Sequence, residues 1–323
     1  MSTTVTPAPV SLRISLTDRC GLRCLYCRPR PALEDERTHD RLTITDILRF
    51  VAVARATLGV DKLRLTGGEP LLRTDVVAIV AALGRLGLPD LALTTNGQAL
   101  ATLAAPLHAA GLKRVNISLD SLAPGTFTRL AQGGELARTL RGIDAACAAG
   151  LGPVRINTVV MRGINDHEFE ALVEFALARG CEPRFIELMP SGLAPTDYQR
   201  WFLPMDELQT RLARRYQLDP VASATGSSSR RFHIAGPASS GHVGLISPSS
   251  HPFCASCRRL RLTADGRLLG CLGRPEHFRL LGLLREPGME TTRRIASAMR
   301  IALECKRGTG TFAVAMPMSR IGG

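Results

Sequence analysis

The chain has 323 residues, of which 45% are hydrophobic, so it can bury a substantial core and is not a compositionally disordered protein. No apolar run is long enough to cross a bilayer, and the first residues lack the basic and apolar regions of a secretory signal, so we expect a cytoplasmic protein. The net charge of +13 suits polyanionic partners, although only three of the 41 basic residues are lysines and a GC-rich genome would give the same arginine bias.

Strand-like and helix-like segments alternate from residue 11 to about residue 220. Strands are expected at residues 12–16, 62–65, 91–93, 115–119, 154–160 and 184–188. Amphipathic helices are expected at residues 44–58, 76–86, 100–110, 135–149, 167–179 and 206–216. Six such units in sequence predict an α/β fold of parallel strands covered by helices, either a doubly wound sheet or a six-unit barrel with an open side.

A change in composition separates this core from the rest of the chain. Residues 222–240 are rich in Ser, Gly and Ala and contain Arg230 and Arg231. We therefore expect two domains, a core over residues 1–220 and a smaller appended C-terminal module over residues 221–323.

Polar and glycine-rich residues gather where the expected strands end. Gly67, Gly68 and Glu69 follow the second strand, and similar residues follow the others. Ligands bind at this edge in parallel α/β folds, so the pattern predicts one active site there. The two glycines would let backbone groups approach a ligand, and Glu69 would accept a hydrogen bond from an ammonium group, although the segment taken alone is also an ordinary turn.

Three cysteines follow the first strand with the spacing C-x3-C-x2-C: Cys20, Cys24 and Cys27. A structural zinc site normally takes four protein ligands. Three thiolates on a 4Fe-4S cluster leave one iron without a protein ligand, which an amine and a carboxylate can chelate. The spacing favours such a cluster over a zinc site completed by a histidine such as His39, or over three incidental thiols.

A second triad lies near the C-terminus: Cys254, Cys257 and Cys271. Alone it would also fit a zinc ribbon completed by His251 or His277. Beside the first triad, a second cluster with an open iron is the favoured interpretation. The remaining cysteines are expected to be ordinary buried side chains: Cys147, Cys181 and Cys305.

Arginines near these cysteines suggest a phosphate site. Arg259 and Arg261 are two residues apart on an extended stretch and therefore point to the same side. With Arg13, Arg64 and Arg155 they would form a polycationic pocket for a triphosphate. In so arginine-rich a chain, five solvated surface arginines are the alternative.

These segments resemble a known family. Residues 20–27, with Tyr26 before the last cysteine, resemble the signature of radical S-adenosylmethionine (SAM) enzymes. Residues 12–20, 65–73, 114–122, 154–168, 253–272 and 321–323 are similar to the GTP 3',8-cyclase family, lyases that catalyse the first step of molybdenum cofactor biosynthesis. The resemblance runs from residue 11 to the last residue and is looser between residues 272 and 315.

The resemblance implies a partial (β/α)6 TIM-like barrel of the radical SAM type with an appended cluster-binding module. It implies two 4Fe-4S clusters, one on each cysteine triad, and SAM as cofactor. The implied SAM contacts are Tyr26, Gly68, Ser118 and Met189, with Arg184 nearby. The implied GTP contacts are Arg13, Arg64, Thr94, Arg155, Arg259 and Arg261, although the family usually has lysine at position 155. The implied catalytic set is Arg259 and Arg261 with Gly322 and Gly323, a terminal pair that would otherwise be interpreted as a disordered tail.

In the implied reaction, reductive cleavage of SAM yields a 5'-deoxyadenosyl radical that removes hydrogen from C3' of GTP. The ribose radical adds to C8 of guanine, and reduction gives 3',8-cyclo-7,8-dihydro-GTP.

Expected partners are GTP, a reducing electron donor and a downstream pterin synthase, with a homodimer as the candidate assembly, and neither a membrane nor a nucleic acid is expected. The alternatives are another radical SAM enzyme with an auxiliary cluster, such as one that modifies a peptide, and a basic zinc-ribbon protein that binds nucleic acid, for which an aromatic content of 4% is low.

Overall fold

Six parallel strands, arranged in the order in which they occur along the chain, form the middle of the sheet in the computed structural model of this protein. They are β1 (Ser11–Ser15), β2 (Lys62–Thr66), β3 (Asp90–Thr95), β4 (Arg114–Ser118), β5 (Arg155–Val160) and β6 (Glu182–Glu187). All six match strands predicted from the sequence. The structure describes residues 10–27, 42–190, 193–222, 226–236, 240–274 and 277–306. His39, Gly322 and Gly323 lie outside these ranges.

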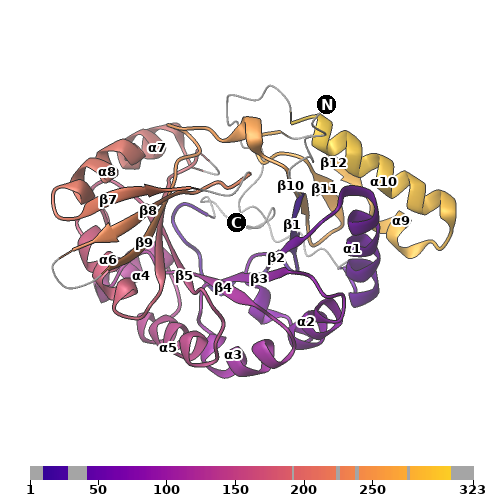
Figure 1. The fold of residues 1–323 in the computed structure, drawn as a ribbon, viewed down its shortest axis with the longest axis horizontal. Helices are drawn as coiled ribbons and strands as arrows, with labels where there is room; N and C mark the ends of the chain where they lie inside the picture. The colour runs from indigo at the N-terminus through magenta and orange to yellow at the C-terminus, as the bar shows by residue number, and fades with distance from the viewer. Residues whose placement is uncertain are drawn as a thin grey trace, which may run out of the picture.

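The six predicted helices are also present, and they lie on the outer face of the curved sheet or beside it (Figure 1). They are α1 (Ile44–Leu58), α2 (Val76–Gly84), α3 (Leu100–Ala109), α5 (Leu136–Ala148), α6 (Phe169–Leu177) and α8 (Met205–Ala213). Within the described part of residues 11–220, two short helices were not predicted, α4 (Pro124–Ala131) and α7 (Pro195–Trp201). Both begin with proline, which is favoured at a first helical position but in a sequence also marks a loop.

Helix α1 shows how local sequence sets these elements. Thr43 accepts a hydrogen bond from the Asp46 N–H, and the Asp46 carboxylate accepts one from the Thr43 N–H, so a capping box starts the helix. Gly59, with a φ of 62°, ends it in the left-handed conformation that favours glycine. Ile47, Phe50 and other buried residues recur at helical spacing and face the sheet.

The C-terminal part of the chain extends the sheet at both edges. Beyond β6 lie β9 (Ser240–Ile246), which is parallel to β6, and then β8 (Arg230–Ala235) and β7 (Gln217–Val221). Beyond β1 lie β10 (Arg259–Leu262), which is parallel to β1, and then β11 (Arg267–Leu269) and β12 (His277–Arg279). Helices α9 (Leu281–Arg285) and α10 (Met289–Glu304) pack beside α1. The predicted division at residue 220 stays a prediction, because the strands on either side of it share one 12-stranded sheet.

The cysteines outside the two triads differ in burial. Cys181 is buried and Cys147 is half-buried, with 3.5 Å between their sulfur atoms. Cys305 is exposed, so the expectation that it is buried was wrong; it follows the last turn of α10. Among the described residues, no helix is both long and apolar enough to cross a membrane.

Glu187 joins the end of β6 to the segment that precedes the second triad. Its buried carboxylate accepts hydrogen bonds from the backbone N–H groups of Met205 (2.9 Å), Ser249 (2.9 Å) and Ser250 (3.0 Å), and from the Ser250 hydroxyl. We expect Glu187→Gln to lower the free energy of unfolding by about 3 kcal/mol, because an amide NH2 cannot accept from the backbone donors it would face. Denaturant unfolding measures this change.

Glu170→Gln is the matched control for that measurement. Glu170 pairs with Arg215 at 2.8 Å, and its side chain is 51% exposed. Loss of such a surface pair should change the free energy of unfolding by less than about 1 kcal/mol. Equal changes for the two variants would contradict the anchoring role of Glu187.

Candidate active site

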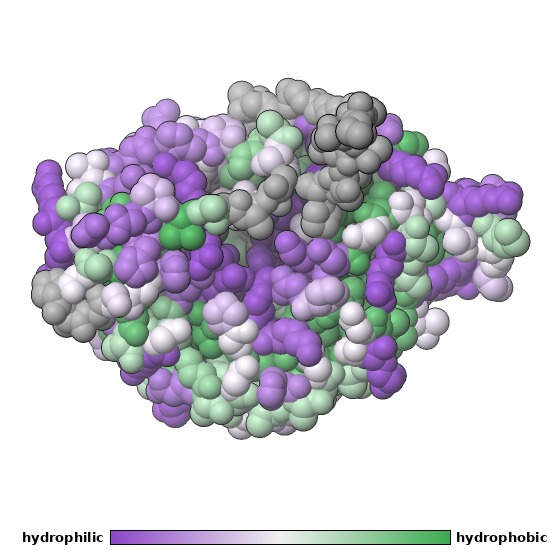
Figure 2. Space-filling view, viewed as in Figure 1, coloured by the Kyte–Doolittle hydropathy of each residue, from purple (hydrophilic) through white to green (hydrophobic). Residues whose placement is uncertain are grey.

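A cavity of about 540 Å³ lies inside the curved sheet, a size typical of small-molecule sites. Residues from the six core strands and from the C-terminal strands line it. Hydrophilic residues gather around the hollow in the middle of the face seen in Figure 2. Both cysteine triads line the cavity, together with every predicted SAM or GTP contact.

The two triads enter the cavity at opposite ends of the parallel strands. Cys20 follows the carboxyl end of β1, whereas Cys257 precedes β10. Because β10 runs parallel to β1, with Arg259 beside Ser11, Cys257 lies at the amino ends of these strands. The expectation of a site confined to the carboxyl edge was therefore incomplete, because the sequence did not reveal the pairing of β10 with β1.

The glycine pair after β2 positions the loop of the first triad. The N–H of Gly68 donates to the Thr17 carbonyl (2.6 Å), and the N–H of Glu69 donates to the Arg19 carbonyl (2.7 Å). A Cβ on Gly67 would lie 2.4 Å from the Thr17 oxygen, and one on Gly68 would lie 2.3 Å from the Arg19 oxygen. The glycines thus allow a close approach to the chain that leads into Cys20.

The Glu69 carboxylate links the ends of β2 and β3. It is buried, and Oε1 accepts from the Leu71 N–H (3.0 Å) and the Thr95 hydroxyl (2.7 Å), while Oε2 accepts from the Asn96 N–H (2.7 Å). Burial raises its pKa, and these hydrogen bonds oppose the rise. The predicted contact between this carboxylate and a ligand ammonium group stays a prediction.

Tyr26 holds the first triad against the end of β4. Its hydroxyl donates to Asp120 Oδ2 (2.7 Å), and Asp120 Oδ1 accepts from the Val159 N–H (2.8 Å). Burial raises the pKa of Asp120 to about 6. The Cys20 sulfur accepts from the Leu22 N–H (3.4 Å) and from Asn96 Nδ2 (3.8 Å), contacts of the kind that tune thiolates on a metal centre.

Lys306 lies against the second triad. Its Nζ is 3.3 Å from the Cys257 sulfur, and its side chain is buried at the end of α10. Burial alone would raise the pKa of Cys257, but the charges of Lys306 and Arg259 outweigh it and lower the pKa. A cationic donor beside a thiolate suits a cysteine that ligates iron.

The described residues do not support the zinc alternative. His251, one proposed fourth ligand, is paired with Asp206, with Nε2 2.7 Å from Oδ2. Within the part of the chain that the structure describes, no three His, Cys, Asp or Glu side chains converge to hold a single metal ion. The number of cysteines still favours an iron–sulfur cluster, since each triad offers three thiols and a structural zinc site normally takes four protein ligands.

Arginines on three adjacent strands form a layer between the triads. Arg13 of β1 is in register with Arg64 of β2 on one side and with Arg261 of β10 on the other. Burial, followed by the charges of Arg259, Arg261 and Arg64, lowers the pKa of Arg13 well below its ordinary value. Among the described residues Arg64 Nε has no hydrogen-bond partner. These arginines are not solvated surface residues, and their mutual repulsion favours an anion among them.

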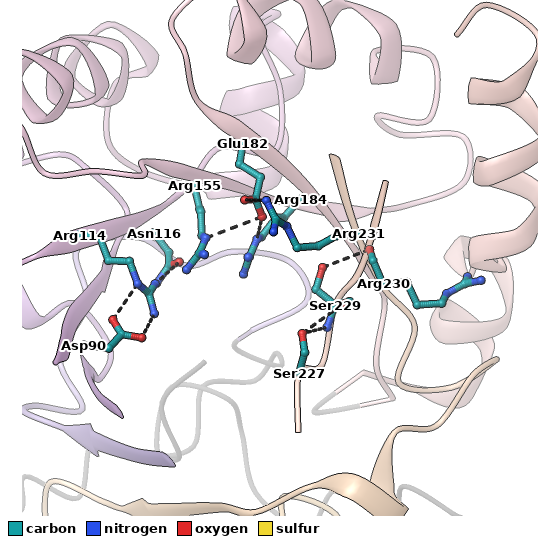
Figure 3. A network of polar contacts seen from close by, with 10 residues as sticks. All are labelled: Asp90, Arg114, Asn116, Arg155, Glu182, Arg184, Ser227, Ser229, Arg230 and Arg231. Carbon is teal, nitrogen blue, oxygen red and sulfur yellow. Dashed lines mark hydrogen bonds and ion pairs between the residues drawn. The ribbon is translucent and has the colours of Figure 1, made fainter. Parts of the chain in front are cut away.

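A second group of arginines follows on β4 to β6 (Figure 3). Arg114 makes two hydrogen bonds to Asp90 (2.8 and 2.7 Å), which neutralise it. Arg184 Nε donates to Glu182 Oε1 (2.6 Å), and Arg155 Nε lies 3.7 Å from the same oxygen. Burial and the charges of Arg184 and Arg114 lower the pKa of Arg155 to about 10.

The remaining predicted residues fall around the same cavity. The Thr94 hydroxyl accepts a hydrogen bond from Asn116 Nδ2 (3.2 Å). Ser118 and Met189 line the cavity at the carboxyl ends of the strands, the end at which the first triad lies. Sequence reasoning gave no site role to several lining residues, among them Arg114, Arg231 and Lys306. Lys306 alone carried a signal, as one of three lysines in a chain that otherwise uses arginine.

Comparisons with known proteins agree with this geometry. The profile of the Radical SAM superfamily matches residues 14–176, and that of Molybdenum Cofactor Synthesis C matches residues 181–312. The GTP 3',8-cyclase of Paenarthrobacter nicotinovorans is 46% identical, over 85% of this chain and 80% of that protein. The GTP 3',8-cyclase 1 of Pseudomonas aeruginosa is 45% identical, over 85% of this chain and 83% of that protein. Among solved structures, Streptococcus suis SuiB shares the fold with a TM-score of 0.61 at 15% identity, over 85% of this chain and 64% of that chain.

Proposed function

Because the chain belongs to the GTP 3',8-cyclase family of radical SAM enzymes, we propose that its cavity converts GTP into (8S)-3',8-cyclo-7,8-dihydroguanosine 5'-triphosphate, the first step of molybdenum cofactor biosynthesis. One observation carries the proposal. A layer of half-buried and buried arginines lies between two cysteine triads in one cavity, which suits a triphosphate held between two clusters. A peptide substrate would have no need of such a layer.

The family implies one 4Fe-4S cluster and SAM, and Cys20, Cys24 and Cys27 are the residues that would hold that cluster. When bound, the cluster and SAM supply a carbon-centred radical that removes hydrogen from the substrate. The chain's own residues position this chemistry. Glu69 Oε2 is available to a SAM ammonium group, and Tyr26, through Asp120, fixes the loop that carries the cysteines.

Cys254, Cys257 and Cys271 would hold a second 4Fe-4S cluster, which would supply an iron without a protein ligand for binding the guanine. The three thiols line the cavity, and Lys306 and Arg259 lower the pKa of Cys257, which favours the thiolate form. Arg259 and Arg261 extend from this triad into the arginine layer on one strand. They would bind the phosphates while excluding water from the radical.

Further elements of the proposal concern partners. An external reducing donor is proposed because the reaction consumes electrons, and a downstream pterin synthase because the product is a precursor. A homodimer is proposed from the family resemblance alone. Gly322 and Gly323, outside the described residues, are proposed to reach the cavity because residues without side chains fit between two clusters.

The function is tested by anaerobic incubation of the cluster-loaded protein with dithionite, SAM and each nucleoside triphosphate in turn. We expect 5'-deoxyadenosine wherever SAM is cleaved, with or without a productive substrate. A cyclised product should form with GTP and with no other nucleoside triphosphate. A protein that yields 5'-deoxyadenosine but never a cyclised nucleotide would contradict the assignment to GTP.

Arg155 offers a test of the phosphate contact. Its side chain is 17% exposed, and its pairing with Glu182 is loose, so either basic side chain can present a cation here. We expect Arg155→Lys to change the KM for GTP by no more than about three-fold and Arg155→Ala to raise it by about ten-fold, because a charge-assisted contact is lost. Initial-rate measurements decide this, and an alanine variant with an unchanged KM would remove Arg155 from the site.

A further inference from the structure

Arg231 lies in residues 222–240, the segment whose composition was interpreted as separating the core from the C-terminal module. The residues from Gly226 to Ser229 lead into β8, and these residues and Arg231 line the cavity. Its neighbour Arg230 is not among the lining residues and pairs with Asp206 (3.5 Å). Adjacent arginines on one strand therefore serve opposite faces, as strand alternation requires. Figure 3 shows Arg231 directed toward Glu182 and Arg230 directed away from it.

Glu182 is the shared partner of three arginines from three strands. Arg184 Nε donates to Oε1 (2.6 Å), Arg155 Nε lies 3.7 Å from Oε1, and Arg231 Nη2 donates to Oε2 (3.2 Å). Burial alone would raise the pKa of Glu182, but the charges of Arg184, Arg155 and Arg231 outweigh it and the pKa is lowered. The carboxylate is thus ionised and binds guanidinium groups on both of its oxygens.

Gly244 makes this arrangement possible. It lies on β9, in register with Arg184 of β6 on one side and with Arg231 of β8 on the other. A Cβ at Gly244 would lie 2.5 Å from Ser229 Oγ and 3.0 Å from Arg184 Cγ. Without a side chain on the intervening strand, Arg231 can reach across β9 to the carboxylate of β6.

The charge of this group is unbalanced. One carboxylate faces three guanidinium groups, and their side chains are only 17%, 11% and 30% exposed for Arg155, Arg184 and Arg231. Burial lowers the pKa of Arg184 as well. Two uncompensated positive charges that line a cavity call for an anion, and the small residues beside Arg231 leave room for one.

We propose that Arg231 is a further binding residue for the triphosphate, and that Glu182 is the positioning residue that holds Arg231 and Arg155 at one subsite, while Arg184, which the family resemblance places near SAM, fixes the Glu182 carboxylate. The inference rests on the proposed function, since it takes GTP as the substrate. The subsite recognises phosphate oxygens, so it contributes to binding of the triphosphate and not to the radical steps on the ribose and the guanine.

Arg231→Gln tests the binding role, with Arg230→Gln as the control on the neighbouring position. Arg231→Gln should raise the KM for GTP by about ten-fold or more while kcat stays unchanged, because a contact equal in the ground and transition states is lost. It should raise the inhibition constant of inorganic triphosphate by a similar factor, whereas Arg230→Gln should leave both constants unchanged. Equal constants in the two variants, or a fall in kcat alone, would overturn the proposal.

A double-mutant cycle tests the positioning role. If Glu182 acts by holding Arg231, the effect of Arg231→Gln on the KM should shrink in a Glu182→Gln background. Independent, additive effects would overturn that role, and thermal unfolding of each variant identifies any that are simply misfolded. A wild-type protein that forms no cyclised product from GTP would refute the proposed function itself. Cyclisation with a KM insensitive to Arg231 would refute only this inference.

Discussion

Replacing Cys20, Cys24 and Cys27 together by alanine is expected to abolish SAM cleavage and to remove about half of the iron, because one of the two proposed clusters loses all its protein ligands. The three thiols sit on the loop held by Gly68 and Glu69, so their loss leaves the sheet intact. Iron and acid-labile sulfide per chain, electron paramagnetic resonance of the reduced protein, and chromatographic detection of 5'-deoxyadenosine measure the result.

The matched variant replaces Cys254, Cys257 and Cys271. It should lose a similar amount of iron but keep some uncoupled SAM cleavage, while forming no cyclised product, because the two triads enter the cavity at opposite ends of the parallel strands. Cys147→Ser, a thiol outside the cavity, should change neither property. One equivalent of zinc with no sulfide in an anaerobic preparation would rule out the scheme.

Much of the core fold was predictable from the sequence because its signals are local. Alternating segments of apolar residues indicated all six parallel strands, and the amphipathic spacing over residues 44–58 indicated helix α1 where the structure has it. The addition of C-terminal strands at both edges of the core sheet was not predictable. The pairing of β1 with β10 joins residues on opposite ends of the chain, such as Ser11 and Arg259, and no local pattern encodes such a register.

The site divides in the same way. The cysteine triads and the pair Arg259 and Arg261 have spacings that indicate their chemistry directly from the sequence. Arg114 and Arg231 have no such spacing. In an arginine-rich chain the sequence does not distinguish an arginine that lines the cavity from one on the surface. Gly68 was expected to meet a ligand, and the structure shows that its lack of a side chain first serves the packing against Arg19.

Arg13→Met is expected to lower kcat/KM for GTP by about 100-fold and, unusually for loss of a buried polar contact, to raise the thermal stability of the protein without GTP. Arg13 is the middle residue of the layer between Arg64 and Arg261. Burial and the neighbouring arginine charges lower its pKa in the folded protein. At neutral pH the guanidinium is protonated in both the folded and unfolded states, so the folded state bears the full cost of this repulsion, which would fade only at a pH above the lowered pKa.

GTP should reverse the order of stability. A ligand that binds only the folded state stabilises it by an amount that grows with its concentration relative to Kd, so the wild type gains more than a variant with weakened binding. Thermal unfolding of the cluster-loaded proteins over a series of GTP concentrations should therefore show two curves that cross. Curves that stay parallel would mean that Arg13 does not contact the nucleotide.

Arg114→Met is the control that separates repulsion from pairing. Arg114 lines the same cavity, but Asp90 accepts two of its hydrogen bonds, and the two side chains are 12% and 22% exposed. Its removal leaves a half-buried carboxylate without its cation, so this variant should be less stable than the wild type without GTP by about 1 to 3 kcal/mol. If Arg13→Met and Arg114→Met both destabilise the protein, then Arg13 is held by partners as Arg114 is, and the arginine layer is a structural feature, not a site kept charged for a triphosphate.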